Sequence, residues 1–369
     1  MTSLRSTIKS IIELCGNKKQ FVFYSESKFY NFHYLELIKN LTQKYKNKIY
    51  YLTSDPKDKV FKNNKRINHF YIGNGLLKFI ILSTIKCDFF VTTLTDIGKN
   101  IFKSRNCKEY IYFFHSFAST NQIYKFEAFK YYDYIFCVGE YHLKEIIEYE
   151  EKFRFPKKKT INCGYFYLDY LMKSSSKKLM QRDQVLFAPS WNYEYKNLFN
   201  DYGLDIINIL LKNNFKIVFR PHPEILKRSI KKFNEIKKIF DKELSFSIDL
   251  SSCPKKSLES SEILITDNST ISMEFLFVFK RPTLFINYKK KIHNVNFHKS
   301  HNTPFENVVK NKFGSEIDIK NIKTLPKVLK EIKKKKPLKG EVDRFLKKNV
   351  FNIGNSAKIA AKILNDISN

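Results

Sequence analysis

The sequence lacks any apolar run long enough to cross a membrane. Its best run, residues 76–85, is too short to span a bilayer and is interrupted by Lys78. The first residues also lack the apolar stretch of a signal peptide, because Arg5, Lys9 and Glu13 interrupt it. We therefore expect a cytoplasmic protein.

The sequence also lacks paired cysteines. Its 6 cysteines are scattered, without the close spacing of zinc ligands or of a disulfide framework. This distribution is typical of reduced thiols inside a cell. It argues against a zinc site and against a fold held together by disulfides.

Acidic residues are scarce relative to basic ones. The chain has 36 Asp and Glu against 67 Lys and Arg, which gives a formal net charge of +31. This charge points to an anionic partner, which can be nucleic acid, an acidic membrane face or a phosphorylated substrate. No known nucleic-acid-binding motif accompanies it, so we expect no nucleic acid partner and favour an anionic membrane surface or phosphates. The chain is also rich in Lys, Asn, Ile, Phe and Tyr, as translation of an AT-rich genome gives, and we assign part of the charge to this bias.

Short apolar runs alternate with helical patterns along the chain. This alternation predicts the α/β class, with parallel sheets covered on both faces. The length of 369 residues suggests two domains of about 150 residues each. A Ser- and Lys-rich stretch without an apolar period separates them. We expect an N-terminal domain at 1–172, a linker at 173–184, a C-terminal domain at 185–350, and a helix at 351–369 that can pack back across the domains.

One histidine lies between two prolines directly after a predicted strand. The strand at 216–220 ends at Arg220, because Pro221 lacks a backbone N–H and restricts its neighbour. A second proline fixes the other side of His222. Ligands bind at the carboxyl edge of open α/β sheets, so we interpret this turn as part of a site. The alternative is a strand cap with a surface histidine.

Polar clusters follow four of the predicted strands. If both sheets face one cleft, all four clusters line it. A strand followed by Asp-Asn-Ser-Thr and a helix also suits anion binding, since amides at a helix start can hold phosphate oxygens. The alternative there is ordinary helix capping by Asp267 or Ser269. The four clusters are His115-Ser116, Ala188-Pro189-Ser190, Arg220-Pro221-His222 and Asp267-Asn268-Ser269-Thr270.

The motifs in combination resemble those of the CDP-glycerol glycerophosphotransferases, the polymerases and primases of teichoic acids and related capsule polymers. The main signature is Ile-Thr-Asp-Asn-Ser-Thr at 265–270 followed by Glu274, Arg281-Pro282 and Phe285. The resemblance covers about residues 108–369. Its other segments are 185–191, Arg220 to Pro223, 352–363, and 163–169, where the family's Pro and Arg are missing.

The resemblance implies a GT-B fold, in which an N-terminal Rossmann-like acceptor domain and a C-terminal nucleotide-donor domain enclose a cleft. It implies transfer of a phosphoglycerol unit from CDP-glycerol to a hydroxyl of a cell-surface polymer or lipid-linked glycan, without a metal or cofactor. His115 matches the family's general base, although Ser116 replaces the glycine that follows it. The resemblance also implies that His222 lies near the pyrophosphate. Ser269 and Thr270 match phosphate-binding hydroxyls, and Glu274 matches an acid that could hold the ribose.

The chemistry of these side chains agrees with such a transfer. An acceptor alcohol loses its proton as it attacks, and neutral His115 is a suitable base near pH 7. The charge that develops on the departing CMP needs fixed donors, which Arg220, His222 and the helix start at Ser269 can supply. The complete predicted donor- and phosphate-binding set is Ser116, Ser190, Arg220, Asp267, Asn268, Ser269, Thr270 and Glu274.

Two other functions are compatible with the sequence. A GT-B glycosyltransferase would use the same fold to move a sugar from a nucleotide donor during capsule or lipopolysaccharide synthesis. A basic membrane- or polymer-binding protein with a degenerate site is the third possibility, and the missing glycine after His115 supports it. For the transferase, a lipid-linked or polymeric acceptor implies a peripheral protein on the inner face of the cytoplasmic membrane.

Overall fold

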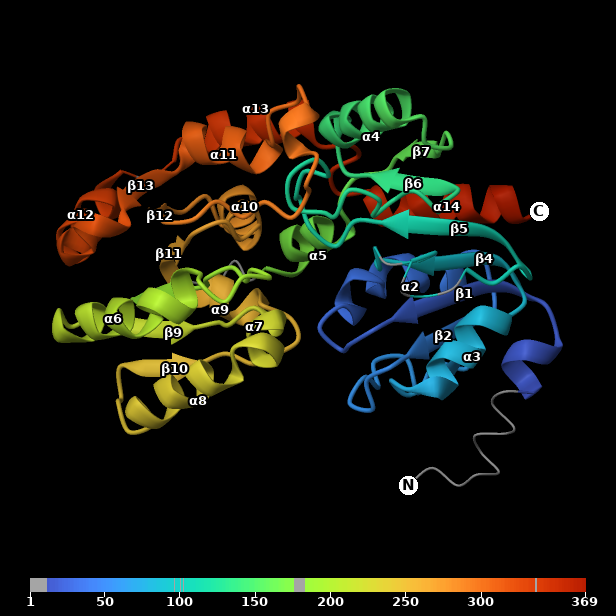
Figure 1. Cartoon of the computed structure of the whole chain (residues 1–369), viewed down its shortest axis with the longest axis horizontal. Coiled ribbons are helices and arrows are strands. Elements are labelled where there is room, and N and C mark those ends of the chain that lie inside the picture. The colour runs from blue at the N-terminus through green and yellow to red at the C-terminus, as the bar shows by residue number, and fades with distance from the viewer. Residues whose placement is uncertain (1–11, 96, 100, 102, 176–182, 336) are drawn as a thin grey trace. The chain divides into compact units, whose positions relative to one another are not determined.

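A computed structural model describes residues 12–95, 97–99, 101, 103–175, 183–335 and 337–369 (Figure 1). The chain forms two compact units. The first contains residues 1–115, Tyr124–Tyr170 and Val350–Asn369, and the second contains Ser116–Ile123 and Leu171–Asn349. Most of the linker expected at 173–184 lies outside the described residues, because 176–182 are not described. Within the described residues, no helix is both long and apolar enough to span a membrane.

The described part of the first unit contains a seven-stranded parallel sheet of order β3-β2-β1-β4-β5-β6-β7. Its interior strand β1 is apolar on both faces, and Phe21, Val22 and Phe23 are fully buried, as a sheet covered on both sides requires. The strands are β1 (Lys19–Ser25), β2 (Ile49–Thr53), β3 (Ile67–Tyr71), β4 (Cys87–Thr92), β5 (Cys107–Phe113), β6 (Tyr134–Cys137) and β7 (Lys159–Asn162).

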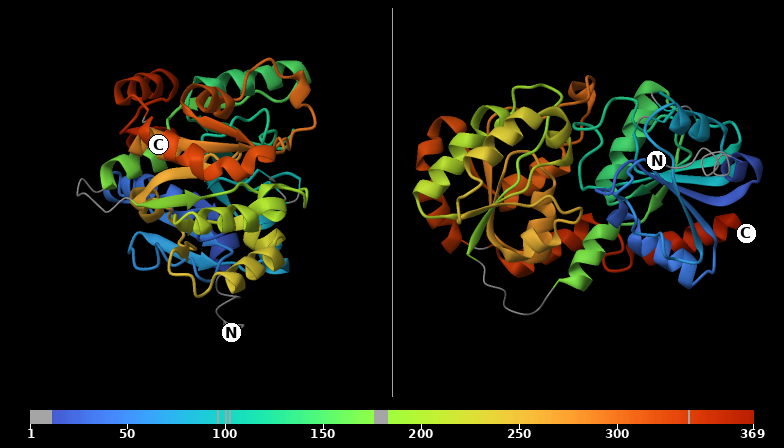
Figure 2. Two further views of the ribbon diagram at one scale, coloured as in Figure 1. Left: turned by 90° about the vertical axis from the view of Figure 1, so that its left-hand side faces the viewer. Right: turned by 90° about the horizontal axis from the view of Figure 1, so that it is seen from below.

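Helices cover both faces of this sheet (Figure 2). The C-terminal helix belongs to this unit, because its small residues Ala360 and Ala361 pack in one core with Leu37 and Leu41 of α2. Alanines on that face allow the two helices to approach closely, so residues from the two ends of the chain share one core. The helices are α2 (Leu35–Gln43), α3 (Leu76–Thr84), α4 (Glu140–Phe153), the start of α5 (Phe166–Ser174) and α14 (Ser356–Ser368).

The described part of the second unit contains a six-stranded parallel sheet of order β10-β9-β8-β11-β12-β13. The chain starts at the central β8, adds β9 and β10 on one side, and then crosses to add β11, β12 and β13 on the other. The direction of winding therefore reverses between β8 and β11, which is where this class of sheet binds ligands. The strands are β8 (Gln184–Phe187), β9 (Lys216–Phe219), β10 (Phe246–Ile248), β11 (Ser261–Thr266), β12 (Thr283–Asn287) and β13 (Ser315–Asp318).

The helices of this unit bury their apolar sides on the sheet. The Leu329 and Ile332 side chains of α12 lie in one core with Phe187 and Ile265 of the central strands. The sequence pattern over 225–240 indicates one basic helix, but the chain forms two helices there, which meet at Ser229. The helices are α6 (Leu198–Lys212), α7 (Pro223–Arg228), α8 (Ile230–Ile239), α9 (Lys255–Ser260), α10 (Ile271–Glu274) with a π-helical turn (Phe275–Phe279), α11 (Phe305–Phe313), α12 (Leu325–Lys334) and α13 (Lys339–Asn349).

The predicted N-terminal domain at 1–172 included residues 116–123. In the structure, Ser116–Ile123 belongs to the second unit and interrupts the first. Its polar side chains bond to the loop between β12 and α11. The Ser119 hydroxyl accepts from the Phe305 N–H at 2.6 Å, and the Asn121 amide donates to the Asn302 carbonyl at 2.7 Å. We call this stretch the 116–123 segment. The segment starts directly after His115. The predicted general base His115 is therefore the last residue before the chain leaves the first unit.

Candidate functional site

Two predicted site residues meet at the point where the second sheet reverses its winding. Ser190 follows β8 and Asp267 follows the adjacent β11. The backbone N–H and the hydroxyl of Ser190 each donate to a different oxygen of the Asp267 carboxylate, both at 2.7 Å. Both side chains are buried. The carboxylate therefore holds the loop after β8 in one position and has its own charge compensated by two donors.

The remaining residues of the Asp-Asn-Ser-Thr cluster lie between β11 and α10. The Asn268 side chain donates to the Lys289 carbonyl at 3.1 Å, which ties this turn to the loop after β12. Ser269 and Thr270 are partly exposed, and their carbonyls accept the first hydrogen bonds of the α10 turn. Glu274 is buried at the end of α10. Their contacts with phosphate and ribose stay predictions.

His222 caps helix α7. Its Nδ1 accepts a hydrogen bond from the Glu224 N–H at 3.1 Å. A ring nitrogen that accepts carries no proton, so the imidazole is neutral and its proton lies on Nε2. His222 therefore presents an N–H donor, with the Trp191 ring 5.9 Å away between centroids. This is the form that could donate to a phosphate oxygen.

Arg220 is engaged with the loop after β10. Its guanidinium donates to Asp249 Oδ2 at 2.6 Å and to the Ser251 carbonyl at 2.9 Å. Burial alone would raise the pKa of Asp249, but Arg220 and neighbouring hydroxyls stabilise the carboxylate and hold its pKa below the usual value. These bonds fix the end of β9 on which the Pro-His-Pro turn is built. Contact of Arg220 with a donor stays a prediction.

His115 follows β5 in the first unit and lies among aromatic rings. Its carbonyl accepts from the Tyr165 hydroxyl at 2.9 Å, and its ring is 5.3 Å from that of Tyr30 and 6.0 Å from that of His33. Burial holds the pKa of His33 well below its usual value, with a smaller contribution from the nearby His115 imidazole, so His33 is neutral. The Ser116 hydroxyl accepts from the Ala118 N–H at 3.3 Å within the 116–123 segment.

Two further motif segments meet in the first unit. The Asp169 carboxylate accepts from both the N–H and the hydroxyl of Ser356 at 2.7 Å, and from the Gly354 N–H. Gly164 has φ +98°, and a Cβ there would clash with the Phe351 carbonyl oxygen. Residues 163–169 therefore hold the start of α14, which lies within the motif segment 352–363, in place.

Sequence reasoning missed a cluster of aromatic and basic side chains beside His222. Lys291 Nζ lies 4.9 Å from the Trp191 ring centroid and the Arg228 guanidinium lies 5.1 Å from it. The His293 ring is 5.0 Å from the same indole. We call these residues the Trp191 cluster: Trp191, His222, Arg228, Lys291 and His293.

Signals for this cluster are present in the sequence. Trp191 is the only tryptophan of the chain and directly follows Ser190. Lys291 and His293 follow β12, so they also lie after the carboxyl end of a strand. Residues 288–303 show no helix or strand pattern, so the sequence alone indicates only a loop there. Burial lowers the pKa of Lys291 to about 8, although Asp267, Glu306 and Glu224 oppose the shift.

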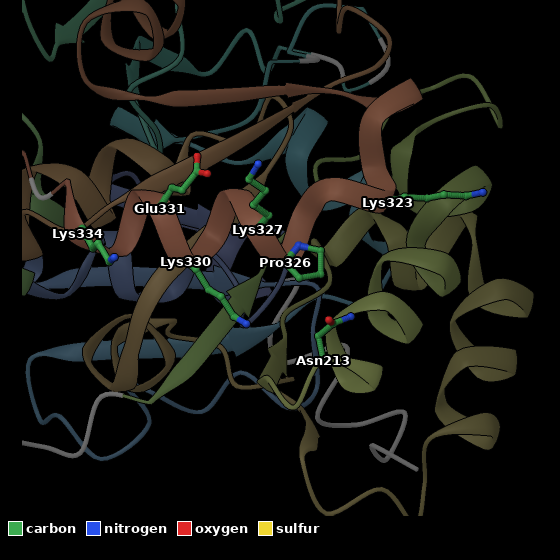
Figure 3. Close-up of a pocket in the computed structure, with 7 residues that line it drawn as sticks. All are labelled: Asn213, Lys323, Pro326, Lys327, Lys330, Glu331 and Lys334. Atoms are coloured by element: carbon green, nitrogen blue, oxygen red, sulfur yellow. The ribbon is translucent and has the colours of Figure 1, made fainter.

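A basic hollow of about 460 Å³ lies elsewhere in the second unit (Figure 3). Lysines of α12 and its preceding turn line it, and none of the predicted site residues does. Its lining residues are Asn213, Lys323, Pro326, Lys327, Lys330, Glu331 and Lys334. No set of three or more His, Cys, Asp or Glu side chains in the described ranges is arranged to hold a metal, and the metal-free site stays a prediction.

Comparison with known proteins shows the relatives of this chain. Residues 17–368 match the model of a family described as CDP-glycerol:poly(glycerophosphate) glycerophosphotransferase. The minor teichoic acid biosynthesis protein GgaB of Bacillus subtilis (strain 168) is 27% identical over 169 residues. That match covers 38% of this chain and 17% of GgaB, so the chain spans less than a fifth of this relative.

Solved structures show the same fold at low sequence identity. The wall teichoic acid polymerase TagF has a TM-score of 0.61 at 15% identity, covering 95% of this chain and 88% of that chain. UDP-GlcNAc 2-epimerase of Methanocaldococcus jannaschii, in complex with UDP-GlcNAc and UDP, has a TM-score of 0.60 at 15% identity, covering 95% and 100%. These likenesses and the two parallel sheets confirm the predicted α/β fold of GT-B type.

Proposed function

The chain belongs to the CDP-glycerol:poly(glycerophosphate) glycerophosphotransferase family, and we propose that it transfers a phosphoglycerol unit from CDP-glycerol to a hydroxyl of a cell-surface polymer. The observation that carries this proposal is the family match over residues 17–368. The hydrogen-bonded pair Ser190 and Asp267 supports the proposal. The pair lies where the strand order of the second sheet reverses, between β8 and β11, and nucleotides bind at such points in sheets of this class.

The second unit would hold the donor. Its diphosphate would lie near the Nε2–H of His222 and the start of α10 at Ser269 and Thr270. The Asp267 carboxylate would act indirectly, by fixing the loop that carries Ser190. Fixed donors of this kind stabilise the charge that develops on the departing CMP.

The first unit would supply the base. The acceptor hydroxyl oxygen would attack the β-phosphorus of CDP-glycerol while His115 removes its proton. A new P–O bond forms to the acceptor, and the bond from the β-phosphorus to the bridging oxygen breaks. CMP leaves with that oxygen, and phosphoglycerol is then attached to the acceptor.

The acceptor and the location of the protein are part of the same proposal. A lipid-linked glycan or growing teichoic-acid or capsule polymer would bring the protein to the inner face of the cytoplasmic membrane. The net charge of +31 and the lysines along α12 support attraction to anionic lipid headgroups. Release of the protein from anionic vesicles by added salt would test this, since surface charge attraction is screened by ions.

A nucleotide-sugar glycosyltransferase is the second candidate. The fold shared with an epimerase solved with UDP-GlcNAc favours keeping it. A nucleotide-release assay decides between the two candidates. The purified chain is incubated separately with CDP-glycerol and with UDP- and CMP-sugars, and the released nucleotide is measured.

Slow CMP release from CDP-glycerol is the expected result. Release of UDP or CMP from a nucleotide sugar, with CDP-glycerol left intact, would replace the proposal by the glycosyltransferase. Binding of none of these donors would favour the third possibility, a basic binding protein with a degenerate site.

A further inference from the structure

Lys291 is a buried lysine whose ammonium has neither a hydrogen-bond nor an ion-pair partner among the described residues. Its side chain belongs to the loop after β12, and the residue is 8% exposed. Within the described residues its ammonium makes no hydrogen bond and no ion pair, and its contact is with the Trp191 ring at 4.9 Å. A buried ammonium is costly unless hydrogen-bond acceptors surround it. This position therefore calls for an anionic ligand.

The surrounding carboxylates do not satisfy Lys291. Asp267, Glu306 and Glu224 all act on it through space. Asp267 already accepts two hydrogen bonds from Ser190, and Glu306 accepts from a backbone N–H. Glu224 pairs with two cations of its own helix. Asp267 and Glu224 are thus committed elsewhere, and Glu306 Oε1 has no hydrogen-bond partner among the described residues, Lys291 included. The combined field of the three carboxylates favours the charged form of the ammonium.

The backbone around Lys291 is held in place by the 116–123 segment. The Gln122 side chain donates to the Lys291 carbonyl at 3.1 Å, and the Gln122 carbonyl accepts from the His293 N–H at 2.9 Å. The Asn294 side chain donates to the Asn121 carbonyl at 2.8 Å. The ammonium therefore sits on a fixed loop beside Asp267, which lowers the entropy lost when a ligand binds.

We propose that Lys291 is a ligand of the donor diphosphate, held against the face of Trp191 and next to the Ser190–Asp267 pair. The inference rests on the proposed function for the nature of the donor, a nucleotide diphosphate. A lysine ammonium binds phosphate as a point charge. In the reaction it would neutralise the negative charge that grows on the departing nucleotide phosphate.

The test measures the Kd for CDP-glycerol, CDP and inorganic pyrophosphate by calorimetry. Lys291→Met keeps most of the side chain's length and removes its charge, and we expect Kd for all three to rise about tenfold or more. Lys291→Arg should restore part of the affinity. The matched control is Lys290→Met, which removes the same charge from an exposed neighbour and should change Kd less than about twofold.

Thermal unfolding separates a binding role from a structural one. A lysine that supports the fold would lower the melting temperature when replaced. The Lys291→Met protein should melt at or above the wild-type temperature, because an unpaired buried charge has been removed.

The wild-type protein provides a measurement that needs no variant. Kd for CDP should rise as the pH passes about 8, where Lys291 loses its proton. The other charged and titratable groups facing this site are Asp267, Glu306, Glu224, Arg228, His222 and His293. Titration of these groups could also change the Kd. The rise in Kd is assigned to Lys291 only if it is absent in Lys291→Met.

Unchanged pyrophosphate affinity in folded Lys291→Met, or an equal loss in Lys290→Met, would overturn the inference. If the wild type binds a nucleotide sugar instead of CDP-glycerol, the proposed function fails. The inference then still stands if pyrophosphate binding depends on Lys291, so the two failures are distinguishable.

Discussion

Ser190 and Asp267 share two hydrogen bonds of 2.7 Å although they are 77 residues apart in the chain. The pair joins the loops after β8 and β11 where the second sheet reverses its winding. Its energetic role can be measured by a double-mutant cycle with Ser190→Ala and Asp267→Asn. We expect a coupling of about 1–3 kcal/mol in the free energy of unfolding, from urea denaturation. Strictly additive effects would show that the bond between the Ser190 hydroxyl and the Asp267 carboxylate does not stabilise the fold.

Substitutions of His222 separate its structural role from its chemical role. His222→Ala removes the Nδ1 acceptor of the α7 cap and should cost about 1 kcal/mol of stability. It should also abolish CMP release. His222→Asn restores a good capping side chain, so we expect stability to recover while CMP release stays lost. Recovery of both in the Asn variant would limit His222 to a capping role.

His115→Ala should abolish transfer without weakening donor binding. The predicted donor residues lie in the second unit, whereas His115 lies in the first. Kd for CDP-glycerol and the rate of transfer to an acceptor are measured on the same preparation. The control is His298→Ala, which changes an exposed histidine and should keep the wild-type rate. A full rate in His115→Ala would remove His115 from the mechanism.

Asp169 should matter for stability and not for donor binding. Its buried carboxylate takes three hydrogen bonds from the start of α14. Asp169→Ala leaves those donors without a partner, and we expect a loss of about 3 kcal/mol or more from urea denaturation. Ser356→Ala removes one donor and should cost about 1 kcal/mol. If Asp169→Ala unfolded at the same urea concentration as the wild type, α14 would be held by apolar packing alone.

The pH dependence of stability should report Lys291. Burial lowers its pKa from 10.5 to about 8 in the folded chain, so between these values the unfolded chain binds more protons. The penalty of burying the charge is complete below about pH 8 and disappears as the pH rises towards 10.5. Lys291→Met should therefore be more stable than wild type at pH 7, and the difference should shrink at alkaline pH. A difference independent of pH would contradict the shift.

The sheets and their polar ends were predictable from the sequence, since buried parallel strands are short apolar runs that end at polar turns. Strand β13 could not be predicted from the sequence, because only Ile317 of its four residues is buried and no apolar run marks the strand. The break at Ser229 was also missed, since both flanking helices continue one apolar pattern. Membership of the 116–123 segment in the second unit depends on bonds to residues about 180 positions away, such as Asn121 to Asn302, which local patterns cannot reveal.

The account depends most on phosphoglycerol transfer by two histidines. Its most direct test follows CMP formation from CDP-glycerol with a teichoic-acid-type acceptor, comparing wild type with the single His115→Ala and His222→Ala variants. The account predicts CMP and a lengthened acceptor with wild type, and neither with either variant while both remain folded. Wild-type turnover in either variant, or no turnover of CDP-glycerol by wild type, would contradict it.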